Sequence, residues 1–452
     1  MSSDDKKPAV AQLAIIHSDP AEYGDVKHLE MIKRRHKNLG GSILFYHDPV
    51  NIVRGEGVWL FDDENKRYLD CYNNVASVGH CNPYIVDALT KQAKTLNIHT
   101  RYLHTNVIDY AEKLSGLMPD KLEVCFFVCT GSEANDLAMQ LARVATGNNG
   151  GIVVESAYHG NTTLIKEMST CTYPADEIPE HTVTVEPPNT YRGPFREGEH
   201  DNLGERYADL VDESIVELNR RGQGVAAFMC DTIFDTQGSL DTPRDYFKHV
   251  YEKIHAAGGV CIADEVQAGL CRTGTWWGFE HFDVVPDIVT LGKPMGDGHP
   301  IAAVVTTRAI ADKFAESSFY FNTFAGNPVS ASVGKAVLEV CERDHLVANC
   351  AEVGAYFKQQ LEKLAESQPL IGCIHGIGLF LGIELVIDRK TKEPAADVAR
   401  LIPDAMKERG ILMGATGRYG NVLKVRPPLI FSKANVDQVV STLDEVMNDI
   451  IN

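Results

Sequence analysis

The sequence predicts an α/β fold: a mainly parallel central sheet with helices on both faces, and a smaller α+β domain formed by both ends of the chain. The main observation is an alternation of short apolar runs with helical stretches that continues to about residue 328. Such an alternation is typical of a parallel sheet covered on both faces. The length of 452 residues also exceeds one typical core. We expect residues 76–335 to form the large domain, and residues 1–75 and 336–452 to form the small one.

The N-terminal part contains one predicted amphipathic helix at residues 25–38, followed by strands. Residues 51–61 and 67–72 alternate between apolar and polar side chains, and acidic residues separate the two runs. This pattern indicates a β-meander. From Asn82 onward the apolar period changes to 3.6 residues, which indicates a helix.

The central part supplies the strands of the large sheet, and the C-terminal part returns to the small domain. The predicted central strands are residues 124–128, 151–155, 225–229, 260–263 and 288–291. Prolines between residues 173 and 204 indicate a loop excursion. The predicted C-terminal elements are helices at 331–343, 350–366 and 435–450, and strands near 374–385 and 421–426.

Charge, cysteine content and hydropathy argue against a nucleic-acid-binding protein, a membrane protein and a protein with a cysteine metal site. A net charge of -19 disfavours binding to nucleic acids or anionic membranes, since both need a basic surface. The 11 cysteines are odd in number and scattered in apolar runs, without a metal-ligand spacing, so we expect reduced packing thiols and no metal. No apolar run reaches about 18 residues and the N-terminus lacks a signal-peptide pattern, so we expect a cytoplasmic protein.

Two predicted strand ends carry residues that together indicate one ligand. Asp264 follows the run at 260–263, and Lys293 follows the run at 288–291. Ligands of open α/β sheets bind at the carboxyl ends of the strands. Pyridoxal phosphate requires both residue types, because its aldehyde forms a Schiff base with a lysine and its ring nitrogen needs an aspartate to hold a proton. Alone, each residue would more often be a turn residue or a solvated charge, but the pair favours this cofactor.

The sequence from Asp264 to Gln267, with Arg-Thr-Gly at 272–274 and Lys293 in a glycine-rich turn, resembles the class III pyridoxal-phosphate aminotransferases. The resemblance runs from about residue 51 to the C-terminus. It implies a fold type I transferase in which Lys293 and Asp264 are catalytic. It also implies that Val266 backs the cofactor ring, that Gln267 reaches the ring hydroxyl, and that Tyr158 stacks on the ring.

A second turn indicates the site of the cofactor phosphate. Residues 130–135 lie between a predicted strand and a helix expected to begin at Ser132, and a helix N-terminus attracts anions. The same turn would also serve as an ordinary helix cap. Its sequence resembles the phosphate loop of the family, which assigns Gly131 and Ser132 to the phosphate. Thr323 resembles the residue that reaches the phosphate from a neighbouring subunit, which implies a homodimer with shared active sites, or a tetramer.

One departure from the family pattern concerns the substrate. Ordinary members carry an arginine that clamps a carboxylate, and the matching position here is Lys424. A lysine lacks the bidentate fork of arginine but still suits a phosphate. Arg426, two residues on and on the same strand face, could restore a fork. Tyr46 and Asn73, with Asn74, are the other positions expected to face the substrate.

Residues 71–81, 131–136 and 292–300 resemble the phospho-lyase branch of the family, which acts on ethanolamine phosphate or 5-phosphohydroxy-lysine. The resemblance implies elimination of phosphate from a phosphorylated amine. With O-phosphoethanolamine the products would be acetaldehyde, ammonia and phosphate. The alternative is an aminotransferase of the ω-amino-acid or alanine:glyoxylate type, which shares every cofactor residue. A non-catalytic binding protein is disfavoured, because both Asp264 and Lys293 are present.

Overall fold

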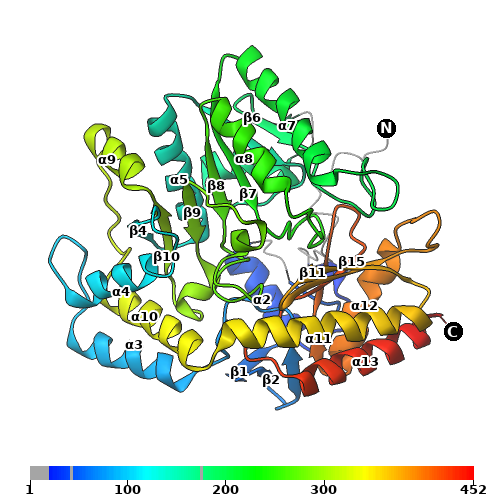
Figure 1. Cartoon of the computed structure of the whole chain (residues 1–452). Helices are drawn as coiled ribbons and strands as arrows, with labels where there is room; N and C mark the ends of the chain where they lie inside the picture. The colour runs from blue at the N-terminus through cyan, green and yellow to red at the C-terminus, as the bar shows by residue number, and fades with distance from the viewer. Residues whose placement is uncertain (1–19, 41–43, 174–176, 452) are drawn as a thin grey trace.

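A seven-stranded sheet forms the centre of the computed structural model, which describes residues 20–40, 44–173 and 177–451 (Figure 1). Its strand order is β4-β10-β9-β8-β7-β5-β6. Strands β5 to β9 pair in parallel, whereas β10 is antiparallel to both of its neighbours. The prediction of a mainly parallel sheet is confirmed. The strands are β4 (Val124–Val128), β5 (Gly150–Val154), β6 (Thr182–Val185), β7 (Val225–Asp231), β8 (Val260–Asp264), β9 (Ile288–Leu291) and β10 (Ala302–Thr306).

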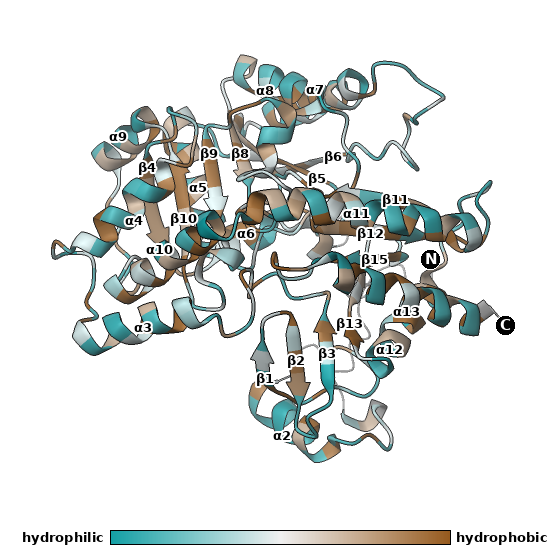
Figure 2. Cartoon of the chain, turned by 60° about the horizontal axis from the view of Figure 1, so that its bottom comes forward, coloured by the Kyte–Doolittle hydropathy of each residue, from teal (hydrophilic) through white to brown (hydrophobic). Residues whose placement is uncertain are grey.

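Helices cover both faces of this sheet. Ala302 and Val304 of β10 belong to a core cluster with α5 (Gly131–Thr146), α7 (Leu203–Arg220) and α8 (Tyr246–Ala256). The alternate residues Ala303 and Val305 pack instead with α4 (Thr105–Ser115) and α10 (Pro328–Arg343). Successive side chains of a strand point to opposite faces, so each face has its own apolar layer. Figure 2 shows the apolar strands β8 to β10 between helices whose outer sides are hydrophilic.

The two ends of the chain build two further four-stranded sheets. One has the order β1-β2-β3-β13 and the other β11-β12-β15-β14. In the first, β3 pairs in parallel with β13, with Leu69 opposite Ile411. Their strands are β1 (Ile52–Glu56), β2 (Trp59–Asp62), β3 (Arg67–Asp70), β11 (Ile371–Ile377), β12 (Phe380–Leu385), β13 (Ile411–Leu412), β14 (Gly414–Thr416) and β15 (Val422–Val425). The N-terminal and C-terminal parts therefore share a sheet.

The remaining helices complete the layers. They are α2 (Leu29–Leu39), α3 (Pro83–Thr95), α6 (Thr163–Met168), α9 (Arg308–Ser317), α11 (Leu346–Ser367), α12 (Ala396–Glu408) and α13 (Lys433–Ile451). Helices α11 and α13 pack side by side along one edge of the molecule (Figure 1). The domain boundaries at residues 75 and 335 stay predictions, although residue 335 lies inside α10. Within the described ranges, no helix has the length and apolar character needed to cross a membrane.

Several elements differ from the expectation, each for a physical reason. Residues 51–61 form two strands because Gly57, at φ +59, turns the chain between them. Strand β6 lies inside the proline-rich stretch predicted as a loop, since the prolines flank it. Helix α12 was not predicted, and it contains Pro403, which ordinarily indicates a break.

Candidate active site

A cavity of about 240 Å³ lies at the carboxyl ends of the central strands, where Asp264 ends β8 and Lys293 follows β9. Helix α5 and the segment after β5 complete its wall. The structure thus brings together seven of the eight residues predicted to hold a cofactor. The cavity is lined by Gly131, Ser132, Asn135, Tyr158, His159, Gly160, Asp231, Asp264, Val266, Gln267 and Lys293.

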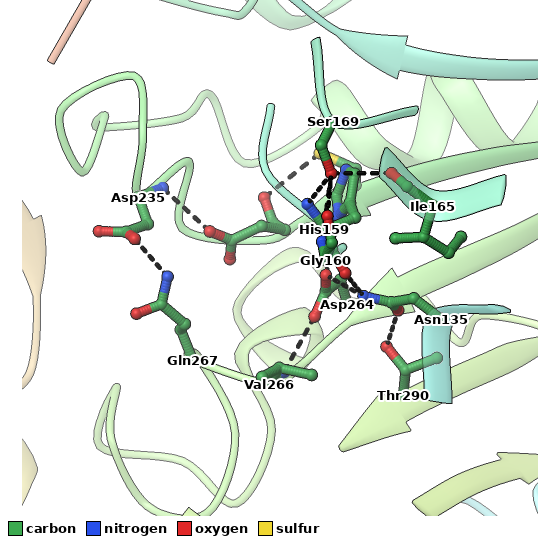
Figure 3. A network of polar contacts seen from close by, with 12 residues as sticks. Asn135, His159, Gly160, Ile165, Ser169, Asp235, Asp264, Val266, Gln267 and Thr290 are labelled. Carbon is green, nitrogen blue, oxygen red and sulfur yellow. Dashed lines mark hydrogen bonds and ion pairs between the residues drawn. The ribbon is translucent and has the colours of Figure 1, made fainter. Parts of the chain in front are cut away.

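Asp264 is held by three donors deep in this cavity (Figure 3). His159 Nδ1 lies 2.7 Å from Asp264 Oδ2, and Asn135 Nδ2 donates to the same oxygen at 2.8 Å. The backbone N–H of Val266 donates to Oδ1 at 3.1 Å. Asn135 is fixed in turn, because it accepts a hydrogen bond from Thr290 Oγ1 at 2.6 Å. The carboxylate therefore has one orientation.

These contacts decide the charge of the two central residues. Burial alone would raise the pKa of Asp264, but the hydrogen bond and charge of His159, with the Asn135 hydrogen bond, hold the pKa below its usual value. Burial lowers the pKa of Lys293, and the charge of Arg426 lowers it further. The site thus combines a fixed carboxylate with a lysine amine that loses its proton more easily than usual.

The N-terminus of α5 faces the same cavity. Thr130 caps the helix: its Oγ1 accepts from the N–H of Glu133 at 3.1 Å, and Glu133 Oε2 accepts from the N–H of Thr130 at 3.2 Å. The helix begins at Gly131, one residue before the predicted start. The N–H groups of Gly131 and Ser132 have no partner within the helix, because the first turn lacks preceding carbonyls. Unpaired N–H groups of this kind attract anions.

Three close approaches shape this end of the cavity for a phosphate and a ring. A Cβ at Gly131 would lie 3.0 Å from Val266 Cγ1, and a Cβ at Gly160 would lie 2.6 Å from Ser132 Oγ. A Cβ at Gly292, the residue before Lys293, would lie 3.3 Å from Gly131 Cα. His159 Nε2 is buried without a hydrogen-bond partner among the described residues. These residues fit a pyridine ring that carries a phosphate arm.

A second cavity of about 500 Å³ shares Tyr158, Gln267 and Lys293 with the first. Its far wall carries Lys424 of β15 and Arg426 just beyond it, both buried. Lys424 Nζ forms an ion pair with Asp235 Oδ1 at 2.7 Å, and Arg426 Nη1 lies 3.9 Å from Asp235 Oδ2. Asp235 follows β7, so the wall joins both parts of the chain.

The wall formed by Lys424, Arg426 and Asp235 has a net positive charge. Burial would raise the pKa of Asp235, but Lys424 and Arg426 lower it to about 2, so the carboxylate is ionised near neutral pH. Arg426 is largely occupied: Nε donates to the carbonyl of Tyr72 at 2.9 Å and Nη1 donates to Gln267 Oε1. Gln267 also donates to Asp235, as Figure 3 shows. Two cations therefore face one carboxylate.

Of the other residues predicted to face the substrate, Tyr46 lines this cavity, whereas Asn73 and Asn74 do not. Tyr46 lines the cavity and donates its hydroxyl to the carbonyl of Met413 at 3.1 Å. Asn73 does not line it, because its side-chain oxygen accepts the N–H of Val75 at 3.0 Å in a local turn. Asn74 instead reaches Gln267 Oε1 at 2.9 Å. The geometry favours Asn74 over Asn73 as a group acting on the site.

Thr323 lies outside both cavities of its own chain and is exposed. Its neighbours Phe319 and Phe324 are 85% and 73% exposed, and Leu103 is 95% exposed. The segment around Thr323 contacts the segment around Leu103, since Arg101 lies over the ring of Phe321 at 3.9 Å. This part of the surface is therefore apolar.

Sequence reasoning missed three residues of the site. Asn135 lies one helical turn after Gly131, so it projects from the same face of α5, and the spacing could have identified it. His159 directly follows Tyr158, but its neighbours give no sign that it meets Asp264. Asp235 pairs with Lys424, which is remote in sequence. No local pattern predicts that contact.

Comparison with known proteins bears on this geometry. The family profile of the class-III aminotransferases matches residues 45–447. An alanine–glyoxylate aminotransferase 2-like protein of Drosophila melanogaster is 41% identical over 93% of this chain and 87% of its own. Ethanolamine-phosphate phospho-lyase homolog 1 of Caenorhabditis elegans is 37% identical over 94% of each chain. A solved phospholyase from Arthrobacter, in complex with phosphoethanolamine, superposes with a TM-score of 0.89 at 41% identity, covering 92% of this chain and 99% of that one.

Proposed function

This chain belongs to the class III aminotransferases, fold type I enzymes that use pyridoxal phosphate, and we propose that it is a phospho-lyase of that family. The proposed reaction removes inorganic phosphate from a phosphorylated amine: O-phosphoethanolamine and one water molecule give acetaldehyde, ammonia and phosphate. The observation that carries this proposal is the cationic wall of Lys424 and Arg426 opposite Lys293. The solved phospholyase, which was bound to phosphoethanolamine, supports the choice of substrate.

The wall suits a phosphate better than a carboxylate. Lys424 is a point charge. Two nitrogens of Arg426 already donate hydrogen bonds, to the carbonyl of Tyr72 and to Gln267 Oε1. Neither side chain therefore offers a free planar fork, which is what specific carboxylate recognition requires. A phosphate dianion needs only positive charge and hydrogen-bond donors. The wall would hold it in the substrate and stabilise it as it leaves.

The residues of the first cavity would hold the cofactor and move a proton. Gly131 and Ser132 would bind its phosphate, Asp264 would keep its ring nitrogen protonated, and Lys293 would hold its aldehyde carbon. When bound, pyridoxal phosphate supplies an electron sink for charge that develops beside the substrate amine. Lys293 Nζ would take the proton from the carbon that bears this amine, since burial favours its neutral form. His159 and Asn135 would keep Asp264 aligned.

We also propose a homodimer with shared active sites, in which Thr323 acts on the neighbouring subunit. The exposed apolar side chains of Leu103, Phe319 and Phe324 support it, because a monomer rarely exposes such a group. A reducing compartment such as the cytoplasm suits the chain, since its 11 cysteines are free thiols and most are buried.

The reaction is tested by measuring phosphate and ammonia together. We expect the purified holoenzyme to release both from phosphoethanolamine in equal amounts, because each turnover frees one phosphate by elimination and one ammonia by hydrolysis of the product. In a parallel assay we expect little amino transfer from alanine to glyoxylate. Efficient transfer from alanine, with no phosphate released from phosphoethanolamine or phosphohydroxylysine, would favour the aminotransferase that the Drosophila relative represents.

Replacing Lys424 tests the cationic wall. We expect Lys424→Ala to lower kcat/KM for phosphoethanolamine by about 10- to 100-fold, because a hydrogen bond to a charged group is worth about 1.5–3 kcal/mol. Lys424→Arg is the matched control, since it keeps the charge and adds a fork. We expect it to retain more lyase activity than the alanine variant and to gain transfer from alanine. If Lys424→Ala eliminates phosphate normally, the anion partner lies elsewhere and Arg426 is the next candidate.

A further inference from the structure

A cluster of metal-ligand side chains lies outside the active site, where β11 meets the segment after β7. Cys373 and His375 are two residues apart on β11, so both side chains point to one side of the strand. Cys373 Sγ lies 3.7 Å from His375 Nδ1, and His375 Nδ1 lies 3.5 Å from Asp241 Oδ2. All three ligand atoms lie within 4.8 Å of one another.

The two separations that involve His375 are close to the edges of a tetrahedral metal site. With Zn–S near 2.3 Å and Zn–N or Zn–O near 2.0–2.2 Å, neighbouring ligand atoms lie about 3.4–3.6 Å apart. The observed separations of 3.7 and 3.5 Å need only a small adjustment. A direct hydrogen bond between nitrogen and oxygen would be shorter, at about 2.7–3.2 Å. The 3.5 Å between His375 Nδ1 and Asp241 Oδ2 is longer than such a bond, which leaves room for an ion between these two atoms.

Hydrogen bonds from neighbouring residues orient two of the three ligands, His375 and Asp241. His375 Nε2 lies 2.9 Å from Glu384 Oε2, and Glu384 is held by Arg192, whose Nε donates at 2.7 Å. Asp241 accepts Lys358 Nζ at 2.9 Å and the N–H of Gly376 at 3.1 Å, but both bonds go to Oδ1. A histidine that binds metal through one nitrogen and a carboxylate through the other is the usual arrangement of zinc sites. Oδ2 of Asp241 stays directed toward His375.

From this geometry we propose that Cys373, His375 and Asp241 bind one zinc ion, with water or a small anion as the fourth ligand. A thiolate, an imidazole and a carboxylate are a zinc donor set, whereas magnesium and calcium prefer oxygen alone. The ion can enter because the Asp241 side chain is 44% exposed and lines an open cavity of about 560 Å³. No metal was expected from the sequence, in which Asp241 lies more than 130 positions before Cys373 and His375.

The position of this site gives the ion a structural role. Asp241 lies in the segment between β7 and α8, which also carries Asp235, the partner of Lys424. Glu384, which orients His375, lies on β12 directly beside β15, the strand of Lys424. A bound zinc ion would tie that segment to β11 and so fix one side of the cationic wall. Zinc binding at this cluster does not depend on which reaction the active site catalyses.

The test uses the untagged holoenzyme after treatment with a chelator. Zinc is titrated in competition with a chromophoric chelator, and bound metal is counted by elemental analysis. We expect about one zinc ion per chain and a higher midpoint of thermal unfolding when zinc is present. Cobalt(II) should give tetrahedral absorption bands in the red, where the cofactor does not absorb. These readouts do not depend on turnover, so they stand even if the proposed reaction is wrong.

Two variants and one control assign the site. Cys373→Ser and Asp241→Asn should each weaken zinc binding by about 10-fold or more and abolish the thermal shift. Cys81→Ser changes an exposed cysteine elsewhere and should bind zinc like wild type. Asp241 is exposed, so its variant should fold even if Cys373→Ser does not. The proposal is overturned if wild type takes up no zinc, or if both variants bind it as tightly as wild type does.

Discussion

Lys293→Ala is expected to abolish turnover and to leave the chain folded. Lys293 lines both cavities, so its side chain meets ligands rather than the core. Loss of a proton-transfer group alone typically costs about 10²–10⁴-fold in rate, and this lysine would also hold the cofactor. The measurements are kcat for phosphate release, cofactor absorbance and thermal unfolding.

The control for this variant is Lys313→Ala. Lys313 is an exposed lysine on α9 that lines neither cavity, so its removal should leave the rate near that of wild type. A Lys293→Ala enzyme that turned over at a similar rate would show that Lys293 is not the base.

Asp264→Asn is expected to retain cofactor but to lose at least about 100-fold in kcat, a typical cost of removing one preorganised electrostatic group. An amide cannot stabilise the ring-nitrogen proton as a carboxylate does. His159 and Asn135 make Asp264 ionised in the wild type, so the change removes a full charge. The measurements are the rate per bound cofactor and the absorbance of the cofactor.

Glu265→Gln is the matched control, because Glu265 is the adjacent buried acid but faces away from the cavity. It accepts the N–H groups of Gly278 at 2.7 Å and Phe279 at 3.0 Å. Burial raises its pKa to about 7, so it is partly neutral already. We expect lower stability but a nearly normal rate per bound cofactor. Equal loss of rate in both variants would mean that Asp264 acts through folding.

Much of the sheet could be predicted because its central strands are buried on both faces. The runs at 260–263 and 288–291 match β8 and β9, since continuous apolar stretches between turns leave little choice. The same property located Asp264 and Lys293 at strand ends. Strand β10, which follows the glycine-rich turn of Lys293 and runs antiparallel to β9, was not among the predicted strands.

The cavity walls were less predictable than the catalytic pair. Lys424 and Arg426 were expected to face a substrate, and both line the second cavity. Their charge balance depends on Asp235, which the chain brings from β7 by tertiary folding alone. Asn73 and Asn74 are neighbours, and only the local turn decides which side chain points inward. Sequence patterns reveal the periodic spacing of apolar residues. The contacts of Asp235 and Asn74 join single polar residues and follow no such spacing.

The parallel pairing of β3 with β13 has a consequence for how the protein is made. Leu69 and Ile411 are about 340 residues apart, and ribosomes add about 5–20 residues per second. The N-terminal meander therefore waits about 20–70 s before its last partner strand leaves the ribosome. During that interval one edge of β3 is unpaired and open to other nascent chains. Arg426, whose N–H bonds to the carbonyl of Cys71, emerges later still. The substrate cavity can therefore close only after synthesis is nearly complete, and chaperone protection of the early strands should raise the yield of active enzyme.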